Sequence, residues 1–436
     1  MGGTLKKDLG LFDATMIIVG SMVGTGIFTT TGLVAMELPN AWHILLAWIV
    51  GGALTLLGAL TYSELGAAFP HAGGDYVYLR ESYGPWAGFL LGWIAFLIIG
   101  PGSIATLSLG LSNYALPLFH IEHHHFYLKK LIAVLLIAMF STVNYFGIRY
   151  ASKLQNTCSV LILLILMGML IVGFIWGLGS LDNFKYTFKD NFSYTQFSVA
   201  IVSVIFAYSG WFASAYVGSE IRNPEKNIPR SIIGGTIIVT TMYMFVNVLY
   251  LYALPVTHMK GQVHIARIAY EALFGLNAAL IVTLAIIIAI LGSLNSAILT
   301  FPRIYYAMAE DGLFFKKVAK IHRRYHTPYV SIVFQAATSS ILVILGNFYQ
   351  LLIYTTFAML ITSVACALGV FILRIKRLDI KRPYRVPGYP YSTSIFLFSY
   401  LWIGLNIFYK KPYESTAGII IALSGIPLYF LWKKKM

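Results

Sequence analysis

Charged residues and cysteine are what this sequence has least of. Asp, Glu, Lys and Arg account for 11% of its 436 residues, whereas soluble domains carry about 25%. Hydrophobic residues make up 58%, and the mean hydropathy is +0.76. So little charge excludes a soluble globular protein and predicts an integral membrane protein.

The chain has two cysteines, Cys158 and Cys366, and both fall inside apolar runs. Thiols in such runs are typically buried side chains, so we predict no disulfide between them. The outer loop after the third apolar run contains no cysteine. A disulfide-linked partner therefore has no point of attachment in that loop.

Acidic residues are outnumbered, because 31 Lys and Arg stand against 16 Asp and Glu, for a net charge of +15. A basic surplus is also typical of nucleic-acid-binding proteins, but here it follows the loops. With both termini in the cytoplasm, 23 basic residues lie on the cytoplasmic side and 8 on the outer side, the bias that membrane insertion follows. We expect a multi-pass protein of the cell (cytoplasmic or inner) membrane, surrounded by the lipid bilayer, with no nucleic-acid partner.

Apolar stretches recur along the whole chain. One bilayer crossing needs about 20 apolar residues. About twelve stretches have this length, near 12–38, 43–68, 86–117, 127–146, 154–177, 197–219, 230–254, 275–308, 328–346, 349–373, 392–409 and 415–432. The first is too long for a signal-peptide core and lacks a small-residue cleavage site, so it is read as a retained span. We predict an all-α membrane protein with a single transmembrane domain over 1–436.

The first stretch is interrupted near its middle, where three glycines and two hydroxyl residues lie between Gly20 and Gly26. Glycine costs a helix roughly 1 kcal/mol relative to alanine, and an open helix in hydrocarbon leaves backbone groups unpaired. Such a break persists where it lines a cavity or where a ligand replaces the missing bonds. The alternative is close helix packing through small residues.

The sixth stretch has a matching interruption, a Ser-Gly pair between aromatic residues at 208–211. Paired interrupted segments in corresponding positions are the best sequence indication of a transporter's central site. The spacing of corresponding spans gives the two five-helix halves opposite orientations. We therefore predict inverted repeats over about 12–177 and 197–373.

Metal and catalytic signatures are weak. Four histidines cluster within 120–125, and histidine clusters can bind zinc, but no further ligand group lies nearby at metal-site spacing. No metal and no cofactor are predicted. The spans also lack paired carboxylates or a nucleophile–base pair, which argues against a membrane enzyme.

A polar segment over 64–80 follows the second span. Its Pro and Gly-Gly signals indicate turns, and we read it as a loop at the inner face. Glu64, Asp75 and Arg80 are its candidates for ion pairs.

Several motifs in combination resemble the amino acid–polyamine–organocation superfamily, in particular its L-type amino acid transporter branch and bacterial serine/threonine-exchanger relatives. They are Gly24-Thr25-Gly26-Ile27-Phe28, the block from Glu64-Leu65-Gly66 to Tyr76-Val77-Tyr78-Leu79, Phe206-Ala207-Tyr208-Ser209-Gly210-Trp211, Asn223-Pro224-Glu225-Lys226 and Gly292-Ser293-Leu294-Asn295. The resemblance, over about residues 9–435, implies the LeuT-like fold. That fold has two inverted five-helix repeats plus two extra helices, here over about 392–432, and holds substrate between unwound first and sixth helices. No disulfide-linked heavy chain is expected.

The chemistry of the two breaks suits an α-amino acid, whose carboxylate and ammonium lie close together. A helix N-terminus favours an anion, so amides at the start of the outer half of span one would bind the carboxylate. The predicted amides are those of Thr25, Gly26 and Ile27. Carbonyls at helix C-terminal ends would face the ammonium, namely those of Met22, Val23, Phe206, Ala207 and Ser209.

Three more residues complete the site analysis. Gly24 belongs to the predicted substrate-binding set, and so does Phe212, which stands where L-type relatives often have asparagine. The resemblance implies that Phe206 is an aromatic gate over the substrate. The alternative is that Phe206 is an ordinary packed core residue. The side-chain selectivity of L-type relatives does not carry over to a site with Phe212.

Coupling is the open point. Many L-type relatives carry a lysine in the fifth helix, which falls at Ile162 here. The leading hypothesis is a sodium-independent exchanger (antiporter) of neutral L-amino acids that works by alternating access. Proton- or sodium-driven uptake is the alternative, because the space at Ile162 could readmit a cation. A non-transporting amino acid sensor is a further class, although the chain offers no signalling domain or long tail.

Overall fold

The computed structural model describes residues 4–119, 126–185, 193–275, 278–346, 348–410 and 412–433. Within these ranges it is helical throughout, and its β pairing is limited to two isolated bridges, Leu9 with Ile221 and Ala72 with Val217. The predicted all-α fold class is confirmed. The predicted histidine cluster at 120–125 lies outside the described residues.

Apolar helices account for every predicted crossing. In the described part of the chain nine helices are long and apolar enough to span a membrane, one further crossing is a bent pair, and two shorter helices are also apolar. The bent pair is α1 (Leu11–Met22) with α2 (Gly26–Glu37), and the shorter helices are α9 (Tyr194–Ala207) and α16 (Tyr329–Leu345). The nine are α3 (Ala41–Ala68), α5 (Pro85–Ile94) continuing through η1 (Ala95–Ile99) into α6 (Gly100–Ala115), α7 (Phe126–Tyr145), α8 (Ile148–Trp176), α11 (Pro224–Ala253), α14 (Ala278–Thr300) continuing into α15 (Pro302–Glu310), α17 (Phe348–Lys376), α18 (Tyr391–Lys410) and α19 (Pro412–Lys433).

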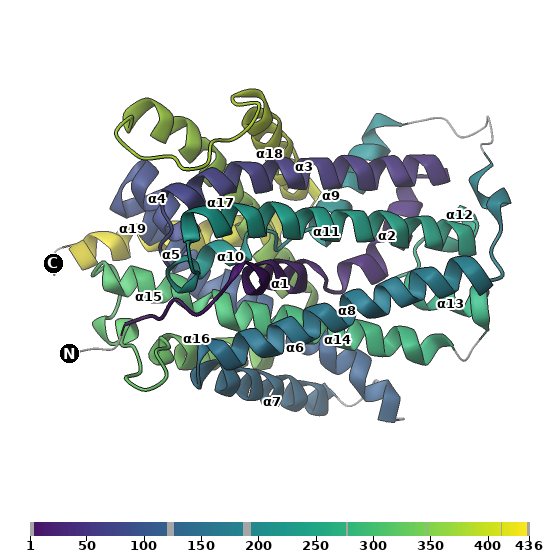
Figure 1. Ribbon diagram of the computed structural model, residues 1–436, viewed down its shortest axis with the longest axis horizontal. Coiled ribbons are helices and arrows are strands. Elements are labelled where there is room, and N and C mark those ends of the chain that lie inside the picture. Colours follow the sequence, from purple (N-terminus) through teal and green to yellow (C-terminus); the bar gives the residue numbers. More distant parts are fainter. Residues whose placement is uncertain are drawn as a thin grey trace.

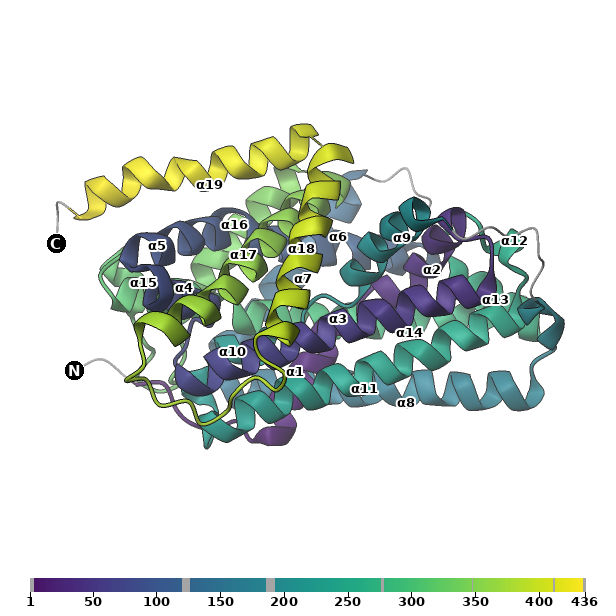
Figure 2. The same ribbon diagram turned by 90° about the horizontal axis from the view of Figure 1, so that it is seen from above.

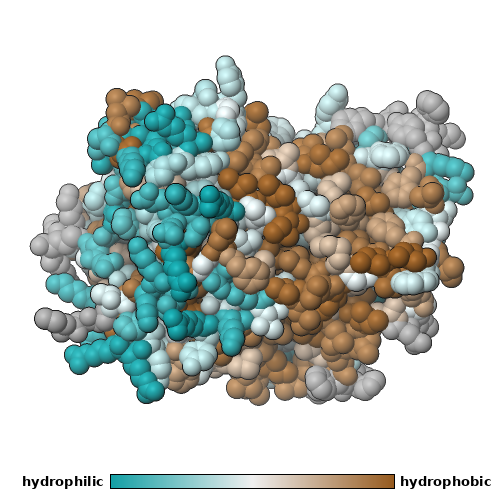
Figure 3. Space-filling view, viewed as in Figure 1, coloured by the Kyte–Doolittle hydropathy of each residue, from teal (hydrophilic) through white to brown (hydrophobic). Residues whose placement is uncertain are grey.

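The broken helix α1–α2 lies in the interior of the bundle. Its first half packs against α8, α11 and α14, and α11 packs along α3. Figures 1 and 2 show α1 between these longer helices, with both termini at one end of the molecule and α12 (Val256–Met259) and α13 (Ile265–Phe274) at the other. On the face in Figure 3, the end with the termini is largely hydrophilic, and the middle and opposite part are largely hydrophobic.

Small residues allow the central helices to approach closely. A Cβ added to Gly51 of α3 would lie 2.4 Å from Val204 of α9, and one added to Gly52 would lie 2.5 Å from Thr240 of α11. Close contact through small residues is typical of membrane helices, where van der Waals packing replaces the hydrophobic driving force. These glycines bring α9 and α11 against α3 and so position the second break.

The segment 64–80 differs from the loop that the sequence predicted. Helix α3 runs on to Ala68, and a new helix, α4 (Asp75–Tyr83), begins after a short turn in which Gly73 and Gly74 have positive φ angles of 107° and 47°. The prediction of a loop was wrong because the polar residues of α4 carry no apolar periodicity, and tertiary contacts with α5, α15 and α17 hold the helix.

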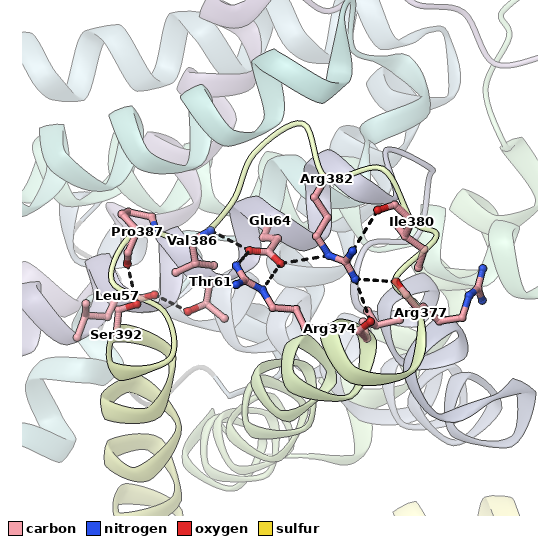
Figure 4. A network of polar contacts seen from close by, with 11 residues as sticks. Leu57, Thr61, Glu64, Arg374, Arg377, Ile380, Arg382, Val386, Pro387 and Ser392 are labelled. Carbon is pink, nitrogen blue, oxygen red and sulfur yellow. Dashed lines mark hydrogen bonds and ion pairs between the residues drawn. The ribbon is translucent and has the colours of Figure 1, made fainter.

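Glu64, near the end of α3, is buried at 3% exposure and needs compensating partners. Its carboxylate accepts a hydrogen bond from Arg374 Nε of α17 at 2.9 Å and from the Val386 amide at 2.8 Å, with Arg382 at 3.6 Å (Figure 4). These contacts tie α3 to the end of α17 and to the segment that follows it.

Candidate functional site

The first break separates α1 from α2 at Val23, Gly24 and Thr25, and the two halves are bent by 41°. Other helices approach the backbone closely here, and at Gly26 the approach leaves no room for a side chain. A Cβ on Gly24 would lie 3.2 Å from Ser293 Oγ, and one on Gly26 would lie 2.7 Å from the Ala207 Cα. The glycines of the motif therefore serve close approach as well as unwinding.

Hydroxyl groups from distant helices hold the end of α1. Tyr243 of α11 donates to the Met22 carbonyl at 2.8 Å. Ser293 of α14 is within hydrogen-bond distance of two carbonyls, that of Gly20 at 2.9 Å and that of Val23 at 3.1 Å. Protein donors thus satisfy carbonyls that unwinding would otherwise leave bare. Sequence reasoning missed both residues, although Ser293 stood in one of the quoted motifs.

At the start of α2, three amides have no backbone hydrogen bond to any residue that the structure describes. Helix α2 begins at Gly26, so the amides of Thr25, Gly26 and Ile27 have no carbonyl one turn earlier in the same helix to bond. The positive end of the helix dipole lies at these amides. Phe28 is the first residue whose amide bonds back, to the Thr25 carbonyl at 3.1 Å. This end of the helix can bind an anion.

The second break runs over residues 208–212, between α9 and the short helix α10 (Ala213–Tyr216). Gly210 has a φ of 100°, and a Cβ there would lie 2.6 Å from the Ser21 carbonyl oxygen. The Ser209 amide bonds the Phe206 carbonyl at 3.1 Å. The two unwound segments therefore meet, Gly210 against Ser21 and Gly26 against Ala207.

A cavity of about 170 Å³ lies at this meeting point. Its lining includes Ser103 and Thr106 of α6 and no Asp, Glu, Lys, Arg or His side chain from the described residues. Eight of the predicted substrate-binding residues line it: Met22, Gly24, Thr25, Gly26, Phe206, Ala207, Ser209 and Phe212. Val23 and Ile27 are buried and do not line it.

A larger vestibule of about 850 Å³ lies next to the cavity. Its lining includes His264, Arg267 and Lys410, and α13, which carries Arg267, lies at the end of the molecule opposite the termini (Figure 1). Phe206 and Thr25 line both spaces. Phe206 therefore stands where the vestibule meets the inner cavity, the place that a gate would occupy.

Tertiary contacts close the end that carries the termini. Glu220 of η4 (Gly218–Glu220) and Arg303 of α15 form a doubly hydrogen-bonded ion pair at 2.8 and 2.9 Å, with side chains 0% and 1% exposed. The Leu9 amide also bonds the Glu220 carbonyl at 3.0 Å. In this conformation the vestibule offers the wide approach to the cavity, and the opposite approach is packed shut.

Ile162 is buried in α8, which packs against α1 and α14. The polar contacts on this side of α1 come from neutral groups. Ser159 donates to the Met16 carbonyl at 2.8 Å, and Gln155 accepts from Asn295 at 2.9 Å. Both cysteines are buried and free, and the described residues contain no cluster of potential metal ligands.

Comparison with known proteins decides the family. The amino acid permease model matches residues 9–431. The chain belongs to the amino acid permease family. This amino acid permease is 33% identical to the serine/threonine exchanger SteT of Bacillus subtilis (strain 168), over 99% of this chain and 98% of that protein.

Two human proteins are similar over nearly the whole permease. The large neutral amino acids transporter small subunit 2 is 32% identical, over 100% of this chain and 82% of that protein. The cystine/glutamate transporter is 30% identical, over 99% and 87% respectively. These matches confirm the predicted family and the prediction that the permease is a transporter and not an enzyme.

Proposed function

We propose that this permease is a sodium-independent exchanger of neutral L-amino acids that works by alternating access. The observation that carries the proposal is the meeting of two broken helices at an uncharged cavity. The free amides that begin α2 suit a carboxylate, and carbonyls at the end of α9 suit an ammonium. Backbone ends recognise the part that all α-amino acids share.

The lining of the cavity supports a neutral side chain. A substrate carboxylate or ammonium in the side chain would be buried without an opposite charge, because no ionisable Asp, Glu, Lys, Arg or His lines the cavity in the described residues. Burying an unpaired charge is strongly unfavourable. Neutral amino acids avoid this cost, and Phe212 and Trp211 offer apolar contact.

Exchange is favoured by the relatives, since SteT is named as a serine/threonine exchanger. Sodium independence is supported by hydroxyl groups from α11 and α14 that reach the end of α1. Tyr243 donates to the Met22 carbonyl, and the single Ser293 hydroxyl hydrogen serves either the Gly20 or the Val23 carbonyl. Proton- or sodium-driven uptake is the second candidate, because the space at the neutral Ile162 could readmit a cation.

Alternating access follows from the asymmetry of the two approaches. With both termini in the cytoplasm, as the distribution of Lys and Arg predicts, the vestibule faces outward and the Glu220–Arg303 side faces inward. The proposed inverted repeats over about 12–177 and 197–373 would then rock about the two breaks. The cavity would open to each side in turn.

Exchange is tested with the purified full chain in proteoliposomes. Vesicles loaded with unlabelled serine, with alanine, or with buffer alone receive labelled serine outside, in sodium and in choline medium. An exchanger takes up label only into amino acid-loaded vesicles, equally in both media. Equal uptake into loaded and empty vesicles would reject exchange, and uptake that requires sodium or collapses with a protonophore would establish the second candidate.

Substrate class is tested by competition of the standard amino acids against the labelled one. Neutral amino acids are expected to compete, and aspartate, glutamate, lysine and arginine to leave uptake unchanged. Competition by charged amino acids as strong as by neutral ones would contradict the neutral site.

A further inference from the structure

Asp75 is a buried carboxyl group without a cationic partner in the described residues. It opens α4, between the second and third crossings, and is 3% exposed. The Tyr216 hydroxyl of α10 donates to its Oδ2 at 2.8 Å, while Oδ1 has no hydrogen-bond partner in the described chain. The predicted ion pairing at the inner face holds for Glu64 and Arg80 but fails for Asp75.

The groups that face Asp75 are neutral polar groups and apolar side chains. Tyr62 of α3, Tyr78 of α4 and the Cys366 thiol of α17 surround the carboxyl together with Tyr216. The other residues that line the void beside Asp75 come from α5, η1, α15, α17 and the second break: Leu91, Ala95, Ile99, Ile304, Met359, Thr362 and Phe212.

Three arginines of the neighbouring elements pair with other acids. Arg303 of α15 binds Glu220, Arg80 of α4 binds Asp311, and Arg374 of α17 binds Glu64. An isolated ionised carboxylate in such surroundings is strongly disfavoured, and the group avoids this by taking up a proton. Burial accordingly raises the pKa of Asp75 to about 7, although the neighbouring Tyr216, Tyr62 and Cys366 groups, Tyr216 most of all, oppose the shift.

Asp75 also lies beneath the substrate cavity. A small void of about 10 Å³ borders Asp75, Phe212 and Tyr216, and the two aromatic residues also line the 170 Å³ cavity. The void has room for about one water molecule. The Gly73 amide bonds the Tyr216 carbonyl at 3.0 Å, so the turn before α4 is attached to α10. A movement of α10 away from this turn would expose the carboxyl to water.

We propose that Asp75 is a proton-binding site of the inward gate, which holds a proton while the gate is closed and releases it when α10 moves away. The proposal rests on the alternating-access function above. It requires no net proton transport, because the same carboxyl can take its proton back when the gate closes.

The direction of the pH effect follows from linkage. A hydrated Asp has a pKa of about 3.9, and the closed gate raises it to about 7. Below about pH 4 both conformations bind the proton, so pH favours neither. Between about pH 4 and about pH 7 the open gate loses its proton first, so rising pH favours opening, and above about pH 7 the effect is complete.

The test is trans-stimulated serine exchange in proteoliposomes with equal pH inside and outside, from about pH 5 to about pH 9. Equal pH removes any proton gradient. The gate equilibrium shifts about tenfold for each pH unit between the two pKa values, so wild-type exchange is expected to rise by up to about a hundredfold between about pH 5 and about pH 7 and then to level off. Asp75→Asn, which mimics the protonated group, is expected to give a slow and flat profile. The matched control Asp379→Asn, at a carboxyl whose side chain is 69% exposed, is expected to keep the wild-type profile.

A second variant keeps the proposal testable if Asp75→Asn does not fold. Tyr216→Phe removes the donor that stabilises the carboxylate, so the midpoint of the profile is expected to move to higher pH by about one unit. A flat wild-type profile, an unchanged profile in Asp75→Asn, or an unmoved midpoint in Tyr216→Phe would each overturn the proton site. Absence of trans-stimulation at every pH would instead reject the exchanger itself.

Discussion

Gly26 and Ala207 bring the two broken helices into backbone contact, because a Cβ on Gly26 would lie 2.7 Å from the Ala207 Cα and 2.9 Å from its Cβ. Neither atom can rotate away, since Cα belongs to the main chain and Cβ is fixed to it. The first turn of α2 and the end of α9 therefore depend on a residue without a side chain at position 26.

Gly26→Val is expected to abolish amino acid binding and leave membrane insertion intact. The added side chain forces α2 away from α9 and obstructs the amides that would hold the carboxylate. Binding is measured as the rise in melting temperature on adding serine, which follows RT ln(1 + [L]/Kd). Gly168→Val is the control, because no atom lies within 4 Å of a Cβ at that position of α8. Wild-type stabilisation by serine in Gly26→Val would place the site elsewhere.

Phe206→Ala is expected to weaken apparent affinity without preventing exchange. The ring lies where the vestibule meets the cavity, and burying an aromatic side chain contributes about 1.5–3 kcal/mol. Loss of part of this contact predicts a rise in KM of about tenfold. Phe245→Ala, at a 54% exposed position of α11, serves as the control. An unchanged KM in Phe206→Ala would reduce Phe206 to a packing residue.

Ser293→Ala is expected to slow exchange by about tenfold, because the Gly20 and Val23 carbonyls lose a donor and a buried unsatisfied group costs about 1–3 kcal/mol. Tyr243→Phe, which removes the donor to Met22, is expected to act in the same direction. Ser198→Ala is the matched control, since the Ser198 hydroxyl bonds its own helix at Tyr194. The exchange rate of each variant is measured in proteoliposomes. Wild-type rates in both Ser293→Ala and Tyr243→Phe would show that the break holds without these hydroxyls.

The sequence predicted the crossings well because the bilayer imposes them. Each apolar run of spanning length contains an apolar helix, the first and sixth runs are broken, and the glycines between Gly20 and Gly26 marked the first break. The donors Tyr243 and Ser293 were not predictable, since they come from helices more than 200 residues away in the chain. Helix α4 was missed because its stability comes from neighbours. Val23 and Ile27 were predicted through a backbone carbonyl and a backbone amide, and neither residue is part of the lining of the cavity.

The Glu220–Arg303 pair is expected to be a large determinant of stability. Both side chains are fully buried, and removing one partner of such a pair costs about 3–5 kcal/mol, because the other charge is left uncompensated. Arg303→Met should therefore lower the melting temperature strongly. Arg267→Met is the control, since the Arg267–Glu271 pair is exposed at the arginine and contributes about 0.3–0.5 kcal/mol.

The double variant Glu220→Leu with Arg303→Met should melt above Arg303→Met, because no charge remains buried and alone. If instead Arg303→Met melts with the wild type, the side that carries the termini is held by the backbone contacts of Leu9 and the packing of α10.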